Sequence, residues 1–451
     1  MEISSKTVND FSKGSIMGNI ARLAIPMTLA QLINVLYNIV DRIYIGRMGF
    51  HAANALTGVG VCLPIISAVI AFSNLIGMGG ASLFSIERGA QHIEESSYIE
   101  GNSFIMLIII GFILTVLGYL FKGPALYLLG ASNATFPFAN SYMNIYLAGN
   151  VFVMLSLGLN YFINAQGFGK TGMLTVAIGA VINIILDPIF IFVLNMGVSG
   201  AALATVISQF ISTCWTIIFL TSKKAVIPLK VKYMTLNFKR IIKITSLGLS
   251  GFTMAITNSL VQIMYNANLQ VYGGDVYVGV MTIINSVREV VQMPVSGVSQ
   301  SAQPIMGFNY GAGIMDRVKK TIKYNSLILI IYTIVAWGLI FLFPKAFLGV
   351  FTENEDILSA GVSALHVYFF GFFFMALQFS GQAVFTALGM AKKAIFFSIF
   401  RKVIIVIPLI YILPKIGNLG TTGIFMSEPI SNLIGGVLCF AVMYFTVYRK
   451  L

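Results

Sequence analysis

Four acidic residues lie inside long apolar stretches of the chain, and these are the first candidates for chemistry: Asp41, Asp187, Glu289 and Glu428. An ionised Asp at the centre of a membrane-spanning helix costs about 2.5–3.5 kcal/mol on insertion scales. Such residues are therefore rare in spans and mark ion or substrate pathways. A carboxylate in this position can bind a proton or a metal cation.

Asp187 lies in the stretch VINIILDPIF, and its neighbours predict a site for a cation or a proton. Asn183 precedes it by one helical turn, so both side chains lie on one face. Pro188 cannot donate a hydrogen bond to the carbonyl of Ile184, which leaves that oxygen free. An acid, an amide and a free carbonyl are suitable ligands. The alternative is that the helix ends near Asp187 and leaves the carboxylate in extracellular water.

Asp41 follows Tyr37 by one helical turn, late in the first apolar stretch. We expect Asp41 and Asp187 at similar depth, in the outer half of the membrane. If they face each other, two like charges in a region of low dielectric need a proton or a cation between them. The alternative is an ion pair of Asp41 with Arg42 or Arg47 at the interface.

Further candidates lie elsewhere in the apolar stretches. Pro26 is half a span before Asp41; it either kinks this helix for gating or is a structural kink only. Arg288 and Glu289 are adjacent, so they point about 100° apart on a helix and each needs its own cavity or partner. Glu428, followed by a proline, either binds a cationic substrate or braces the helices.

The composition shows what kind of elements must position these residues. Hydrophobic residues make up 57% of the 451 residues, and charged residues only 10%, against roughly 25% in soluble domains. Mean hydropathy is +0.89. These values exclude a soluble enzyme, a disordered chain and a nucleic-acid binder. The apolar stretches are continuous and long enough for membrane-spanning helices rather than barrel strands. Twelve are predicted, at residues 18–46, 53–85, 102–121, 139–167, 172–194, 200–221, 241–272, 276–308, 322–343, 361–389, 394–413 and 421–447.

The net charge of +13 follows from membrane topology. With the N-terminus placed in the cytoplasm, most Lys and Arg residues fall in cytoplasmic connections, as the positive-inside rule requires. Both termini are therefore expected in the cytoplasm. Residues 222–240 form a basic central connection, which divides the chain into an N-terminal lobe, 1–221, and a C-terminal lobe, 241–451.

The two lobes carry matching short motifs. Gly89-Ala90 closes the second span and Gly311-Ala312 the eighth, while Ala165-x-Gly167-x-x-Lys170 and Ala387-x-Gly389-x-x-Lys392 follow the fourth and the tenth. Gly197 and Gly417 begin a third pair of similar motifs at nearly the same separation. We interpret this as a tandem duplication of a six-span unit. Parallel repeats of this kind are typical of transporters that rock one half against the other.

Five further motifs are Leu23-Ala-Ile-Pro26, Leu186-Asp-Pro-Ile189, Ala165-Gln-Gly-Phe-Gly-Lys170, Gly200-Ala-Ala-Leu-Ala204 and Gln303-Pro-Ile-Met-Gly-Phe-Asn-Tyr-Gly-Ala312. They resemble motifs of the multidrug and toxic compound extrusion (MATE) antiporters. The resemblance extends from about residue 15 to 447. It implies an all-α polytopic membrane protein with twelve transmembrane helices in two pseudo-symmetric six-helix lobes. It also implies alternating access and export of amphipathic organic cations in exchange for H⁺ or Na⁺.

The resemblance also implies an ion-coupling site in the first lobe. The family's ligands match Asp41, Asn183, Asp187 and Thr205, which would hold H⁺ or Na⁺. Tyr37 matches a tyrosine that lines the cavity. Other branches place acids in the second lobe, including the tenth span, which has none here. Pro26, Arg288 and Glu289 remain candidates for the substrate cavity.

Two other functions remain as alternatives. A lipid-linked oligosaccharide flippase of the same superfamily usually has more spans and a strongly cationic cavity, for which the spans offer Arg42, Arg288, Arg401 and Lys402. A membrane-embedded enzyme usually needs an intramembrane histidine or a Ser–His–Asp set. Of the three histidines, His51, His92 and His366, only His366 lies near a span. We therefore expect no enzymatic activity.

The remaining expectations concern partners and location. The three cysteines, Cys62, Cys214 and Cys439, lie in apolar stretches and are expected to be inert thiols. No cofactor beyond the coupling ion and no nucleic-acid partner is expected. The protein is predicted to be a monomer in the cell membrane of a prokaryote.

Overall fold

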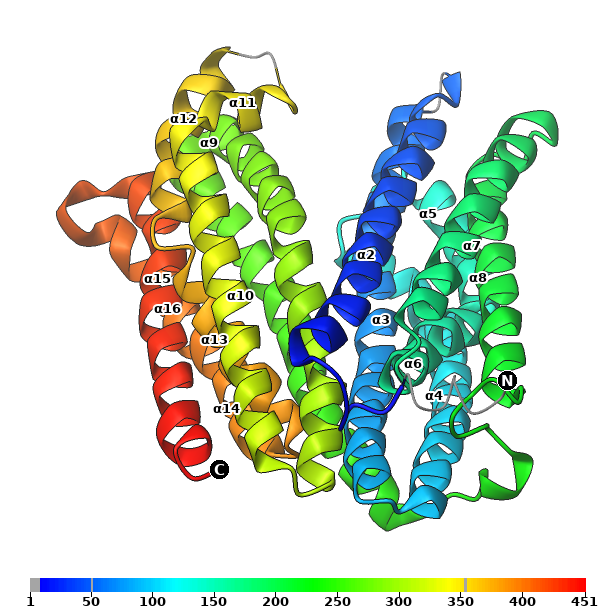
Figure 1. Cartoon of the computed structure of the whole chain (residues 1–451). Coiled ribbons are helices and arrows are strands. Elements are labelled where there is room, and N and C mark those ends of the chain that lie inside the picture. Colours follow the sequence, from blue (N-terminus) through cyan, green and yellow to red (C-terminus); the bar gives the residue numbers. More distant parts are fainter. Residues whose placement is uncertain (1–8, 50–51, 353–354) are drawn as a thin grey trace. The chain divides into compact units, whose positions relative to one another are not determined.

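The computed structural model describes residues 9–49, 52–352 and 355–451, and helices dominate these residues (Figure 1). His51 lies outside the described part of the chain. Within that part there is no β-strand. The all-helical prediction is confirmed. Its physical basis is that backbone N–H and C=O groups in a bilayer must be paired within the segment that carries them.

The number of spans agrees with the predicted twelve. Among the described residues, nine helices are long and apolar enough to cross a membrane, and two bent helix pairs raise the count to eleven. One of the nine, α9 (Phe238–Gly311), has 74 residues and is divided at Gly274, whose φ of 65° and ψ of −164° are not helical. Counting its two parts separately gives twelve.

The helices form two compact units. Unit 1 comprises the residues up to Phe11 and Ile25–Phe252, and unit 2 comprises Ser12–Ala24 and Thr253–Leu451. The division between these units falls within helix α2 (Ile16–Gly46) and within α9. The lobe boundary at residues 222–240 stays a prediction.

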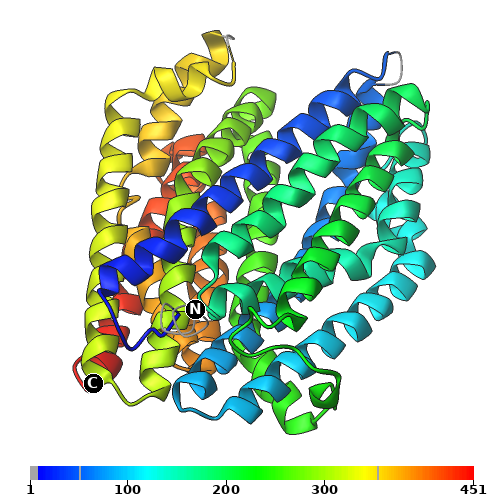
Figure 2. The same cartoon turned by 45° about the vertical axis from the view of Figure 1, so that its right-hand side comes forward.

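Unit 1 is built from the greater part of α2, the beginning of α9 and the elements between them. The other helices are α3 (Ala52–Gly89), α4 (Ile93–Leu128), α5 (Phe136–Ala148), α6 (Asn150–Ala165), α7 (Gly169–Pro188), the π-helix η2 (Ile189–Val193), α8 (Val198–Thr221) and the 3₁₀ turn η3 (Val231–Tyr233). Helix α3 packs against α4 and α6, and α8 packs against α5, α6 and α7. The green helices α7 and α8 lie side by side in both views (Figures 1 and 2).

Unit 2 contains the rest of α9 and the elements that follow it. These are α10 (Met315–Leu342), α11 (Pro344–Gly349), α12 (Glu355–Phe369), α13 (Phe374–Ala387), α14 (Ala391–Ile399), the π-helix η4 (Phe400–Val406), α15 (Ile407–Ile412), η5 (Leu413–Asn418), α16 (Gly420–Met443) and the π-helix η6 (Tyr444–Tyr448). Helix α16 packs against α12, α13 and η4, and α13 also packs against α10. Apolar side chains of these helices form two buried clusters in this unit.

Two predicted spans are bent rather than continuous. The span predicted at 139–167 is formed by α5 and α6, which meet at an angle of 58° at Gly149. A Cβ at Gly149 would lie 2.3 Å from the side chain of Val206, so α8 passes directly against the bend. The span predicted at 361–389 is formed by α12 and α13, bent by 47°. Gly371, between them, has a φ of +70°, which favours glycine.

Helix α3 and the start of α9 approach each other very closely within unit 1. A Cβ at Gly248 would lie 1.7 Å from the carbonyl oxygen of Leu75, and one at Gly79 would lie 2.1 Å from the carbonyl oxygen of Ile244. Only glycine permits this contact between two helix backbones. Small residues allow such close packing in membranes, where burial of apolar side chains gives little driving force.

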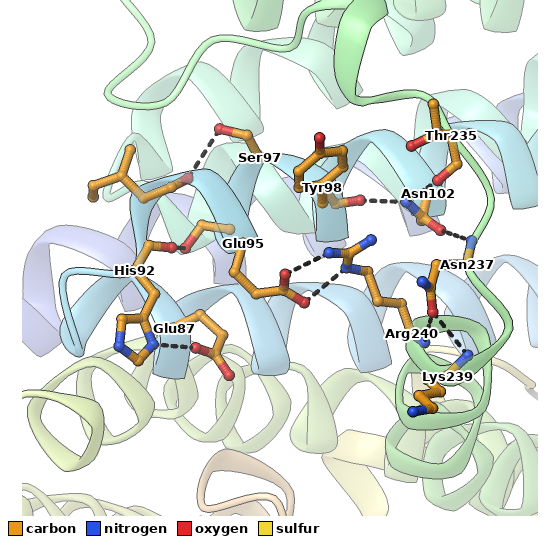
Figure 3. A network of polar contacts seen from close by, with 12 residues as sticks. Glu87, His92, Glu95, Ser97, Tyr98, Asn102, Thr235, Asn237, Lys239 and Arg240 are labelled. Atoms are coloured by element: carbon orange, nitrogen blue, oxygen red, sulfur yellow. Dashed lines mark hydrogen bonds and ion pairs between the residues drawn. The ribbon is translucent and has the colours of Figure 1, made fainter.

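The basic connection is held against unit 1 by polar contacts. The amide of Gln166 donates to the carbonyl of Ile227 at 3.2 Å and accepts from its N–H at 3.0 Å. Arg240 forms a bidentate ion pair with Glu95 at 2.7 and 2.6 Å (Figure 3). Asn102 accepts from the N–H of Asn237 at 2.9 Å. These contacts hold the connection and the start of α9 against α4 and the end of α6.

Candidate functional site

Asp41 on α2 and Asp187 on α7 come together in unit 1. Asp41 is 8% exposed and Asp187 is fully buried. Their carboxyl groups lie within hydrogen-bonding reach of each other. Helix α7 does not end at Asp187, because the chain continues as the π-helix η2. The alternative in which this carboxylate projects into water at a helix end is therefore wrong.

Asn183 and Thr205 complete a small polar cluster around Asp187. The side-chain amide of Asn183 points its Nδ2 at Asp187 Oδ1, 3.3 Å away, and at Thr205 Oγ1, 3.4 Å away. Asn183 is 1% exposed, and Thr205 on α8 is half-buried. The i, i+4 spacing of Asn183 and Asp187 on α7 gives this arrangement directly, whereas Thr205 joins it through the packing of α7 against α8.

Two tyrosines, Tyr37 and Tyr142, lie near the carboxyl groups, and Tyr146 lies beside them. Tyr37, on α2, interacts electrostatically with both aspartates. Tyr142 and Tyr146, on α5, are buried and stacked with ring centroids 6.1 Å apart. The hydroxyl of Tyr142 lies near Thr205 and Asp41. Sequence reasoning identified Tyr37 and missed the other two, although their i, i+4 spacing in a span was a visible signal.

The site has more oxygen atoms than hydrogen-bond donors. Asp41 Oδ1, Asp187 Oδ2 and Asn183 Oδ1 are buried and have no hydrogen-bond partner among the described residues. Neither aspartate takes part in an ion pair there. Arg42, next in the chain to Asp41, is exposed. A buried set of uncompensated oxygens can take up a proton or a small cation.

The candidates of the second lobe are partly brought together, because Arg288 interacts electrostatically with both Glu428 and Glu289. Arg288 is half-buried and Glu289 is exposed. Glu428 is 3% exposed and pairs with Arg401 Nη1 at 3.1 Å and with Lys402 Nζ at 3.1 Å. The two cations compensate the charge of Glu428, which agrees with a role of this residue in bracing the helices.

Two other residues singled out from the sequence have simple environments. Pro26 is buried in α2, which continues through it as one helix. His366 Nε2 lies 3.0 Å from the carbonyl oxygen of Phe341. Among the described residues, no group of three His, Cys, Asp or Glu side chains could hold a metal ion.

Comparison with known proteins decides the family. A family model described as MatE matches residues 26–189 and again 250–412. The chain belongs to the MatE family. The model matches once in the first half of the chain and once in the second, in agreement with two related halves. As a MatE protein with many apolar helices, the chain is a multi-pass membrane transporter.

Relatives of this MatE protein match along nearly the whole chain. It is 25% identical over 437 residues to the multidrug export protein MepA of Staphylococcus saprophyticus, covering 96% of this chain and 95% of that protein. It is 26% identical to MepA of Staphylococcus haemolyticus, with coverage of 96% and 94%. An outward-facing multidrug resistance MATE family transporter of the MOP superfamily superposes with a TM-score of 0.91 at 23% identity, covering 98% of both chains. A MATE solved in complex with MaL6 gives a TM-score of 0.90, also at 23% identity, covering 98% of this chain and 99% of that one. These structures show that the MatE fold is shared.

Proposed function

We propose that this transporter is a secondary active antiporter that exports amphipathic organic cations in exchange for H⁺ or Na⁺ by alternating access. Asp41 and Asp187 would bind the coupling ion, with Asn183 and Thr205 as further ligands. The observation that carries the proposal is the close approach of two buried carboxyl groups that form no ion pair among the described residues.

The names of the relatives support export of drugs. The staphylococcal MepA proteins are multidrug export proteins, and the similarity covers almost their full length. We carry this activity over to the present chain as part of the proposal. Both relatives come from bacteria, which supports a location in a bacterial cell membrane.

The chemistry of coupling follows from charge balance at the site. Two adjacent carboxylates repel each other strongly in a medium of low dielectric, so the pair is stable only when a proton or cation lies between them. Binding of the ion would draw Asp41 on α2 toward Asp187 on α7, and release would let α2 move away. Antiport requires that the ion and the drug favour different states of the protein.

The decisive experiment is dye transport by the purified full-length protein in proteoliposomes. Ethidium efflux is measured under an imposed pH gradient and, separately, under a Na⁺ gradient. We expect one of the two gradients to drive transport, and Asp41→Asn to abolish that dependence. Transport at the wild-type rate by a well-folded Asp41→Asn protein would contradict the proposed ion site.

A matched control is available in unit 2. Asp275 is an acid whose Oδ1 accepts a hydrogen bond from Gln270 at 3.0 Å in an exposed position. Asp275→Asn makes the same chemical change as Asp41→Asn outside the proposed site. It should leave the gradient dependence unchanged.

The flippase alternative predicts more than twelve spans and transport of an anionic lipid precursor. The described residues provide twelve helices when the two parts of α9 and the two bent pairs are each counted as spans. This count favours the antiporter. Movement of an anionic lipid precursor in the same proteoliposomes, without movement of any organic cation, would favour the flippase instead.

A further inference from the structure

A second group of buried charges lies in unit 2, wholly outside the candidate ion site. Arg401 and Lys402, on η4, are 6% and 2% exposed. Both pair with Glu428 on α16, Lys402 through Nζ at 3.1 and 3.2 Å. Arg401 Nη1 also donates to Asn432 Oδ1 at 2.6 Å. The local π-helix carries both adjacent cations into the unit, and such segments are frequent at functional sites.

The carboxylate of Glu428 does not balance this cluster. Arg288, on α9, lies close enough to interact electrostatically with Glu428. Three cations thus surround one buried anion. Glu289 also interacts electrostatically with Arg288, but the side chain of Glu289 is exposed. Even when Glu289 is counted, one positive charge remains in excess. A buried charge without a counter-charge is strongly unfavourable, and either loss of the proton of the buried lysine or binding of an anion relieves it.

The hydrogen-bonding groups of the cluster point to the same class of ligand. The hydroxyl of Tyr368, 2% exposed, lies beside Arg288. This hydroxyl, Arg288 Nε and the hydroxyl of Ser431 are buried and make no well-formed hydrogen bond within the described residues. All three can donate. A guanidinium group with neighbouring hydroxyls is the arrangement that binds the oxygens of carboxylates and phosphates.

We propose that Arg288, Tyr368, Arg401 and Lys402 form a binding site for an oxyanion, that is, for the carboxylate or phosphate group of an anionic ligand. Glu428 holds two of the cations in place and at the same time limits the affinity for the anion. The site is independent of the cation-coupling site in unit 1, and it would exist even if the exported substrate were not a cation.

The test is calorimetric titration of the purified full-length protein in detergent with three probes. These are benzoate, inorganic phosphate and dioctanoyl phosphatidic acid. We expect saturable binding of at least one probe. Binding of benzoate or phosphate would identify a soluble anion as the source of the group. Binding of phosphatidic acid alone would identify a lipid headgroup. Absence of saturable binding by all three probes would overturn the proposal.

Variants with opposite effects locate the site. Arg288→Gln should weaken binding by at least about tenfold, because it removes a cation and a bidentate donor. Glu428→Gln should strengthen it by a similar factor, because it removes the competing internal anion. Lys393→Gln is the control: Lys393 lies in the same unit, and its Nζ contacts Thr446 Oγ1 at 2.7 Å outside the cluster.

A milder variant is included because the variants that remove a charge could fail to fold. Tyr368→Phe removes one hydroxyl and should weaken binding by about threefold. Equal affinities in the wild type, Tyr368→Phe and Glu428→Gln would show that the anion binds elsewhere and would overturn the proposal. Equal affinities are the result expected if Glu428 only braces the helices and the cluster binds no anion.

Discussion

Asp41 on α2 and Asp187 on α7 place their carboxyl groups within hydrogen-bonding reach of each other, although 8% and 0% of their surfaces are exposed. Two residues that share one bound ion should act as a unit. We therefore predict that Asp41→Asn and Asp187→Asn each lower gradient-driven dye transport by at least about tenfold, and that the double variant is no worse than either single one. The measurement is a double-mutant cycle on initial transport rates in proteoliposomes. If the loss of transport rate in the double variant equals the product of the two single losses, the two carboxyl groups act separately.

The hydroxyl of Thr205 is predicted to be a ligand of the coupling ion. Thr205→Val removes one oxygen from the cluster with little change in volume, and Thr205→Ser keeps it. We expect Thr205→Val to raise the ion concentration needed for half-maximal transport by about tenfold, which corresponds to about 1.4 kcal/mol. Thr205→Ser should stay within about a factor of three of the wild type. Indistinguishable behaviour of the two variants would remove Thr205 from the site.

The contact between Gly248 and Leu75 is predicted to be essential for folding. A Cβ at Gly248 would lie 1.7 Å from a backbone oxygen, and backbone cannot rotate away as a flexible side chain can. We expect Gly248→Ala to abolish monodisperse protein in size-exclusion chromatography, or to lower the unfolding midpoint by several degrees.

Gly60 provides the control for this prediction. It lies in α3 of the same unit, and a Cβ there would meet nothing within 4 Å. Gly60→Ala should be neutral or stabilising by up to about 1 kcal/mol, because alanine favours the helix. Equal behaviour of the two variants would show that α3 and α9 can move apart at little cost.

The orientation in the membrane is predicted from the distribution of Lys and Arg. Lys224, in the basic connection, and Lys345, on α11, are both exposed. In intact cells, a membrane-impermeant maleimide should label Lys345→Cys and leave Lys224→Cys unlabelled until the membrane is opened. The native thiols interfere little, since Cys62 and Cys439 are buried; Cys214, which is half-buried, is replaced by Ser. The reverse pattern would invert the predicted topology.

Much of this architecture follows from the sequence because the bilayer imposes a simple rule. A continuous apolar stretch must be a helix, so the run predicted at 18–46 is observed as Ile16–Gly46 and the run at 53–85 as Ala52–Gly89. The proximity of Asn183 and Asp187 also follows, because i, i+4 spacing on a helix is local geometry. These features depend on residues that are near one another in the chain.

Features that depend on distant segments required the tertiary structure. Tyr142 lies near Asp41 and Thr205 only because α5 packs against α8, and the bend at Gly149 lies where Val206 passes closely. Helical periodicity would turn Arg401 and Lys402 about 100° apart. In the structure both side chains are nevertheless buried and reach Glu428, on another helix. The sequence by itself determined which segments are helices and which local faces are polar. Only the packing of the helices decided which polar faces meet, because that depends on the rotation of each helix about its axis, and apolar side chains all round a membrane helix leave this rotation unspecified.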